Sequence, residues 1–183
     1  MRLFMRKIKK VISLMIMCSV LTLCFSNVVF AAQYIYYGGG LKNPEVEVVD
    51  RLGGNTFGYS VSRWNSTSTP VKITEIAGLI PENNYVTSGQ WDDTWYGMYT
   101  PTKQQYIFWG RAVKFKIELN RTNLVGESDT FWRSVLVHEL GHAFCLDDNP
   151  SSGNSSIMNY DRNRNYLTWP TSNDIAGVNN AYK

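Results

Sequence analysis

The sequence predicts a single mixed α+β domain, because segments with strand and helix periodicity alternate along it. Ala112 to Leu119 alternates apolar and charged residues, which is the period of a strand with one buried and one wet face. Thr130 to Phe144 instead repeats apolar residues at helical spacing, and Thr56 to Asn65 does so over a shorter length. No internal repeat or linker divides the chain, so we expect one core.

Residues 1–31 are expected to be a signal peptide, which leaves 32–183 as the domain. Five basic residues precede an apolar run from Val11 to Phe25, and that run of about 15 residues is short for a membrane span. Val29 to Ala31 then offers small residues where a signal peptidase cleaves. The expected location is therefore extracellular, by secretion; an uncleaved membrane anchor is the alternative.

Removal of this segment changes the charge of the protein. The whole chain has 18 basic and 15 acidic residues, but all five basic residues before Ala32 leave with the signal. The mature chain then carries a formal charge of −2, which disfavours nucleic acid as a partner. Of the three cysteines only Cys145 remains, so no disulfide is expected within the chain.

The N-terminal part of the domain is expected to contain strands around one helix. Tyr34 to Tyr37 is aromatic and ends at three glycines, as a first strand before a flexible turn would. Glu45 to Asp50 alternates valine with acidic residues and predicts a second strand. A helix from Asn55 or Thr56 to about Asn65 follows, and Val71 with Ile73 indicates another strand.

The middle of the chain is harder to interpret. Pro81 to Gln105 is rich in aromatic residues, Asn, Asp and Gly, and predicts irregular loops with one short strand around Thr94 to Thr100. Its aromatic side chains either form a platform for sugar or peptide, or pack beneath long loops. After the strand Ala112 to Leu119, whose apolar side is expected to be formed by Val113, Phe115, Ile117 and Leu119, the helix Thr130 to Phe144 follows. A last helix begins near Thr171.

The functional signal lies in the segment from His138 to Tyr160. His138 and His142 are one helical turn apart on one face, so both imidazoles can reach one metal ion. They are the only histidines, and a catalytic zinc site usually has three protein ligands, so the third is a carboxylate or Cys145. Asp148 is the predicted third ligand if the helix ends soon after His142; Asp147 is its rival.

Glu139 lies too far round the helix to share the ion easily. It is placed to hold a zinc-activated water, take its proton and pass that proton to a leaving amine. The pattern therefore predicts peptide hydrolysis with Glu139 as general base and acid.

These residues resemble the metzincin zinc peptidases, whose pattern is HExxHxxGxxH or HExxHxxGxxD followed by a methionine turn. Here His138, Glu139, His142 and Asp148 match, and Ser156 to Met158 follows. The letters around His142 look most like matrixins, whereas an aspartate as third ligand resembles snapalysins. Trp64-Asn65, Leu119-Asn120 and Asp174 to Gly177 also look matrixin-like.

The resemblance implies a metzincin-like zincin fold: a twisted, mostly parallel sheet with an antiparallel edge strand, two long helices, and a small C-terminal subdomain with the methionine turn and a terminal helix. It also implies a cleft for an extended peptide and Met158 as packing beneath the zinc. Matrixins often hold structural Ca²⁺, but no acidic loop here has a convincing ligand pattern for it.

Two positions stand out against the family. Tyr160 follows Met158 by two residues, as in astacins and serralysins, which implies either a catalytic role near the metal and the oxyanion or a wall of the substrate pocket. Cys145 stands where the family has a glycine with positive φ, a conformation that strains a cysteine by about 1 kcal/mol. A cysteine-switch propeptide is not expected between Ala32 and the first strand.

The sequence thus predicts a secreted, monomeric zinc-dependent endopeptidase with one catalytic Zn²⁺, acting on extended peptide or protein substrates. The alternative is a non-catalytic extracellular module that binds glycan or peptide and keeps a structural zinc site. Glu139 discriminates between them, because a purely structural site needs no base beside an open coordination position.

Overall fold

The structure is a computed structural model that describes residues 37–80, 83–104, 110–150 and 156–183. The expected signal peptide, 1–31, and residues 34–36 of the expected first strand lie outside the described residues, and Tyr37 belongs to no strand. Within the described ranges, no helix combines the length and apolar character needed to cross a membrane.

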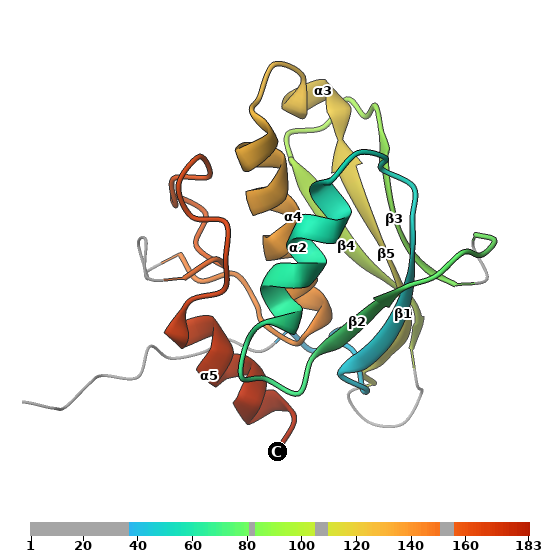
Figure 1. The fold of residues 1–183 in the computed structure, drawn as a ribbon, viewed down its shortest axis with the longest axis vertical. Coiled ribbons are helices and arrows are strands. Elements are labelled where there is room, and N and C mark those ends of the chain that lie inside the picture. Colours follow the sequence, from blue (N-terminus) through green and yellow to red (C-terminus); the bar gives the residue numbers. More distant parts are fainter. Residues whose placement is uncertain (1–36, 81–82, 105–109, 151–155) are drawn as a thin grey trace, which may run out of the picture. The chain divides into compact units, whose positions relative to one another are not determined.

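A five-stranded sheet in the order β2-β1-β3-β5-β4 forms one layer of the domain (Figure 1). Its strands are β1 (Glu45–Asp50), β2 (Lys72–Glu75), β3 (Asn84–Gly89), β4 (Gly97–Gln104) and β5 (Ala112–Asn120). Neighbouring strands are parallel except for β4, which runs antiparallel to β5 at the sheet edge. The expected mostly parallel sheet with an antiparallel edge strand is therefore present.

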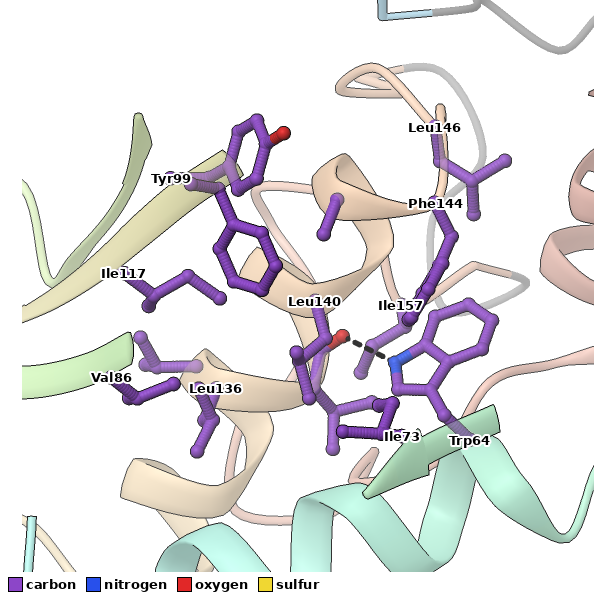
Figure 2. Packing of buried hydrophobic residues seen from close by; sticks show 14 of the residues in the cluster. Trp64, Ile73, Val86, Tyr99, Ile117, Leu136, Leu140, Phe144, Leu146 and Ile157 are labelled. Atoms are coloured by element: carbon purple, nitrogen blue, oxygen red, sulfur yellow. Dashed lines mark hydrogen bonds between the residues drawn. The ribbon is translucent and has the colours of Figure 1, made fainter. Parts of the chain in front are cut away.

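Four helices occur in the described ranges: α2 (Thr56–Asn65), α3 (Arg121–Leu124), α4 (Asp129–Ala143) and α5 (Ser172–Ala181). Helices α2 and α4 pack against each other and against the sheet. The Trp64 indole of α2 donates a hydrogen bond of 2.9 Å to the Val137 carbonyl of α4, within the apolar core (Figure 2). This mixed α/β arrangement is compatible with the expected metzincin-like fold.

Three details differ from the sequence-based expectations. Strand β3 was not predicted, and β4 begins and ends later than the expected strand at Thr94 to Thr100. In β5, Ala112 is buried whereas Val113 is 43% exposed. The register between β4 and β5 shifts on either side of Lys103, so the alternation of β5 changes at its first residues.

Candidate metal centre

Helix α4 carries both histidines and begins with a well-formed cap. The Ser128 hydroxyl accepts a hydrogen bond of 3.1 Å from the Phe131 amide, and Asp129 places a negative charge in the first turn. His138 and His142 then lie on adjacent turns, with ring centroids 4.8 Å apart. The helix spacing therefore brings the two imidazoles together, as the sequence predicted.

The helix ends through a left-handed residue that is not glycine. Cys145 has φ of 70°, the conformation expected for this position. The Cys145 amide donates to the His142 carbonyl at 3.1 Å, and the Leu146 amide donates to the Gly141 carbonyl at 3.0 Å, which together form a Schellman motif. The motif turns the chain back toward the histidines, as delivery of Asp148 requires.

Both imidazoles are oriented by backbone carbonyls. His138 Nδ1 lies 2.9 Å from the Ile157 carbonyl, and His142 Nδ1 lies 2.8 Å from the Leu146 carbonyl. Because a carbonyl can only accept, Nδ1 must carry the proton in each ring. Burial, followed by the charge of Arg162, lowers the pKa of His138 to about 3, so this ring is neutral near pH 7 and its Nε2 presents a lone pair.

Asp148 faces the His138 lone pair with an oxygen that is an acceptor too. Its Oδ1 lies 3.2 Å from His138 Nε2 and 3.8 Å from His142 Nε2. Burial acts to raise the pKa of Asp148, but polar contacts at its carboxylate, among them the hydrogen bond that the Tyr160 hydroxyl donates, outweigh burial and lower it. A carboxylate is therefore present near neutral pH.

This arrangement fits a bound cation. Asp148 Oδ1 is buried and has no hydrogen-bond partner, which is costly for an isolated charged atom. The ligand atoms of His138, His142 and Asp148 lie within 4.8 Å of one another. Ligand bonds of 2.0–2.2 Å at tetrahedral angles require separations of about 3.4 Å, close to the two measured distances. Two imidazoles and a carboxylate are also a donor set that zinc accepts.

The rival ligands lie elsewhere. Asp147 Oδ1 accepts a hydrogen bond of 2.9 Å from the Asp148 amide, so it is used in the turn. Cys145 is buried, and its Sγ is directed at the Leu41 carbonyl (3.5 Å) and the Tyr182 hydroxyl (3.7 Å). Among the described residues, neither belongs to the group that could hold an ion.

Glu139 is buried beside this group without belonging to it. Its Oε2 accepts a hydrogen bond of 2.9 Å from the Tyr99 amide in edge strand β4. Burial raises the pKa of Glu139, the direction that suits a residue that must both take and release a proton. A cavity of about 260 Å³ opens beside Glu139 and His138.

The segment from Ser156 to Met158 packs against α4. Met158 is buried, and its Sδ would clash with a Cβ on Gly141, so the glycine permits this close packing. The Asp174 carboxylate accepts hydrogen bonds from the Ser156 hydroxyl (2.6 Å) and the Ile157 amide (2.9 Å). Asp174 thus positions the segment whose Ile157 carbonyl orients His138.

Tyr160 lies at the open side of the group. Its side chain is 51% exposed, and its hydroxyl donates a hydrogen bond of 2.8 Å to Asp148 Oδ2. That hydrogen bond, with a smaller effect of burial, raises the pKa of Tyr160 to about 12. The phenol therefore keeps its proton at neutral pH and remains a donor, while the ring also lines the cavity.

Sequence reasoning missed Arg162, which is 3% exposed and lines the same cavity. Its guanidinium donates to the Asn159 carbonyl at 2.7 Å and to Ser134, through the hydroxyl at 3.3 Å and the carbonyl at 3.2 Å. Burial lowers the pKa of Arg162 to about 9, so it is still a cation at neutral pH. In the sequence, only the proximity of Arg162 to Tyr160, two residues before it, could have indicated a place in the site.

Of the described aromatic residues at 91–99, Tyr99 is buried and Trp91, Trp95 and Tyr96 are half-buried. Tyr99 is buried in the core, and the Tyr96 ring packs edge-on against Phe131 with centroids 5.0 Å apart. Trp91 and Trp95 pack on each other, with centroids 5.1 Å apart. These contacts favour the expectation of aromatics beneath loops over an open stacking platform.

Comparisons with known proteins add little to this site. No protein-family model matches the chain, and no curated protein matches it. Among solved structures, the chain is similar to the crystal structure of myroilysin, with 14% sequence identity and a TM-score of 0.38. The similarity covers 75% of this chain and 61% of that one, so the chain spans less than two thirds of its length. A likeness this weak carries no argument about function.

Proposed function

We propose that this chain is a zinc-dependent endopeptidase of metzincin type, with His138, His142 and Asp148 as the zinc ligands and Glu139 as general base and acid. One observation carries the proposal. A buried glutamate is held by the sheet edge directly beside three convergent ligand atoms, yet it is not one of them. A site that only stabilised the fold would have no need of this side chain.

In the proposed reaction, Glu139 transfers the proton and the bound zinc would activate the water and the carbonyl. When bound, zinc would lower the pKa of a water molecule and polarise the scissile carbonyl. Glu139 removes the proton from the attacking water and later delivers it to the leaving amine. The Tyr99 amide holds Glu139 Oε2 at 2.9 Å, which leaves Oε1 as the oxygen that exchanges the proton.

Tyr160 is proposed as the second catalytic residue. Its hydroxyl donates a hydrogen bond of 2.8 Å to Asp148 Oδ2 and stays protonated at neutral pH. Rotation of its half-exposed side chain would bring the same donor to the oxyanion that forms as the carbonyl is attacked.

The proposed substrate is an extended peptide or an unfolded protein. Strand β4 is at the sheet edge, and its first residues, Gly97 to Tyr99, lie against Glu139. Among the described residues β4 has no partner strand on its outer side, and this edge can pair with a substrate strand and so place a peptide bond over the site.

Secretion is part of the same proposal. Its support is the basic start and apolar run of residues 1–31, followed by small residues at a cleavage position. We propose that the mature chain, residues 32–183, acts outside the cell as a monomer.

The experiment is cleavage of casein by the purified 32–183 chain, with and without a chelator. Cleavage that the chelator abolishes and zinc restores is the expected result. Glu139→Gln should keep zinc but lose activity by about 10² to 10⁴-fold. Glu127→Gln, at an exposed glutamate, is the matched control and should cleave normally. Full activity of Glu139→Gln would overturn the mechanism, and zinc binding without any cleavage would favour the structural-site alternative.

A further inference from the structure

We infer that the cavity beside Glu139 selects an acidic side chain, so that the chain cleaves peptides next to Asp or Glu. The inference rests on the proposed function and concerns the substrate class rather than the reaction. Three features carry it: two arginines that line the cavity, buried donor atoms without partners, and the balance of charge around the site.

The cavity lies between the edge strand, α4 and the segment after the methionine turn. Thr94 to Gly97 form one wall, and Val135, His138 and Glu139 lie on the α4 side. Tyr160, Arg162 and Arg164 form the remaining wall. Glu139 and both arginines line the same cavity. A substrate side chain that enters it beside the peptide bond to be cleaved would therefore face both arginines.

Neither arginine forms an ion pair within the described part of the chain. The salt bridges there involve Lys116, Arg133 and the two histidines, and none involves Arg162 or Arg164. Arg162 is held by Ser134 and Asn159 through neutral acceptors only. Glu139, Asp148 and Asp174 act favourably on the charge of Arg162, but none of them is within ion-pair distance of it.

Two further donors at the cavity are unsatisfied. Arg164 Nε and Trp95 Nε1 are buried, and neither has a hydrogen-bond partner. The Arg164 guanidinium is held over the Tyr96 ring at 5.1 Å and over the Phe131 ring at 5.6 Å, so it is fixed in place rather than free in solvent. A guanidinium held in this way can donate to a carboxylate on a ligand, which offers two acceptor oxygens.

The charge balance points the same way. Glu139 and Asp148 are the carboxylates nearest the bond to be cleaved, and a divalent cation at the candidate metal centre would offset both. Arg162 then still has the favourable charge of Asp174, so Arg164 is the guanidinium without a carboxylate partner among the described residues. An Asp or Glu side chain would supply the missing charge and accept from the guanidinium groups, whereas Lys or Arg would be repelled.

The test compares peptides that are identical except at the residues flanking the cleaved bond, where Asp, Asn, Leu or Lys is placed. We expect kcat/KM for Asp to exceed that for its isostere Asn by at least about tenfold, because a charge-assisted hydrogen bond is lost. Arg164→Gln should remove most of this preference, and Arg164→Glu should shift it toward Lys. Arg121→Gln, an exposed arginine of α3, is the matched control and should behave as the unmodified chain.

The outcomes separate this inference from the proposed function. Cleavage without preference for an acidic residue on either side of the bond overturns the inference and leaves the peptidase proposal intact. If the zinc-loaded chain cleaves nothing, the peptidase proposal fails. Equilibrium binding of fluorescently labelled Asp and Asn peptides to that zinc-loaded chain then decides: tighter binding of the Asp peptide, reduced by Arg164→Gln, supports acidic selectivity, and equal binding overturns it.

Discussion

Gly97 of the edge strand lies directly against the side chain of Glu139. A Cβ added to Gly97 would be 2.7 Å from both Cγ and Oε1 of Glu139, and 2.7 Å from Val135 Cγ1. The Tyr99 amide, two residues further along the strand, donates to the other carboxylate oxygen. The backbone of β4 thus determines where the proposed general base lies.

Gly97→Ala is expected to displace Glu139 and lower kcat by about 100-fold, since a shift of about 1 Å in a catalytic group costs this much. Zinc content should be unchanged, because Glu139 is not in the ligand group. Peptide kinetics with metal analysis would measure both. Gly58→Ala, whose Cβ would meet nothing closer than 3.4 Å, is the control. Normal kinetics in Gly97→Ala would mean that Glu139 is positioned by something else.

Removal of the metal should destabilise the chain, because Asp148 Oδ1 and His138 Nε2 are then two acceptors 3.2 Å apart. Zinc at a thousand times its Kd should raise the free energy of unfolding by about 4 kcal/mol. The shift of the urea unfolding transition measures this gain. Asp147→Asn should be stabilised by zinc to the same extent, because Asp147 is not in the candidate ligand group.

In Asp148→Asn, zinc should no longer raise the free energy of unfolding by much. The metal-free variant, however, should be more stable than the metal-free unmodified chain by about 1 kcal/mol, because an amide can donate a hydrogen bond to His138 Nε2. The same urea transitions, recorded with chelator, measure this difference. A metal-free Asp148→Asn protein less stable than the unmodified metal-free chain would contradict the lone-pair assignment at His138.

Asp174→Asn should weaken zinc binding by about 10- to 100-fold, although Asp174 touches no ligand atom. Its carboxylate accepts from the Ser156 hydroxyl, the Ile157 amide and the Thr171 amide, and an asparagine would present a donor to one of them. Competition with a coloured chelator measures the affinity. Asp92→Asn, at an exposed aspartate, should leave it unchanged.

Cys145→Gly should be more stable than Cys145→Ala by about 1 kcal/mol, because alanine retains the strain of φ at 70° and glycine does not. The two variants both remove the sulfur, so their difference isolates the backbone effect. Urea unfolding of both proteins gives the comparison. Equal stabilities would show that the left-handed turn is not strained in this chain.

Elements with strong periodicity could be predicted from the sequence. Helix α4 was expected over 130–144 and spans Asp129–Ala143, and the expected strand Ala112 to Leu119 is β5 with one more residue. Strand β3 was missed because Val86 is its only fully buried residue, so it has no alternating pattern to detect. Pairing with β1 and β5, rather than its own composition, makes it a strand.

Some residues of the candidate site could likewise be predicted from the sequence, and others could not. The positions of His138 and His142 follow from helix geometry, and that of Asp148 from a short turn, so local spacing was enough to propose them. Arg162 could not be proposed as a site residue, because its burial depends on Ser134, which is 28 residues away in the chain. The contact of Gly97 with Glu139 likewise depends on how β4 packs against α4.

The dependence of His138, a proposed zinc ligand, on Asp174 has a consequence for the order in which the site is assembled. His138 is oriented by the Ile157 carbonyl, and Ile157 is held by a carboxylate in α5. A growing chain that has emerged from the ribosome only as far as Asp148 would possess all three metal ligands without the support that aligns them. Under the proposed function, proteolytic competence would therefore arise only after translation of α5.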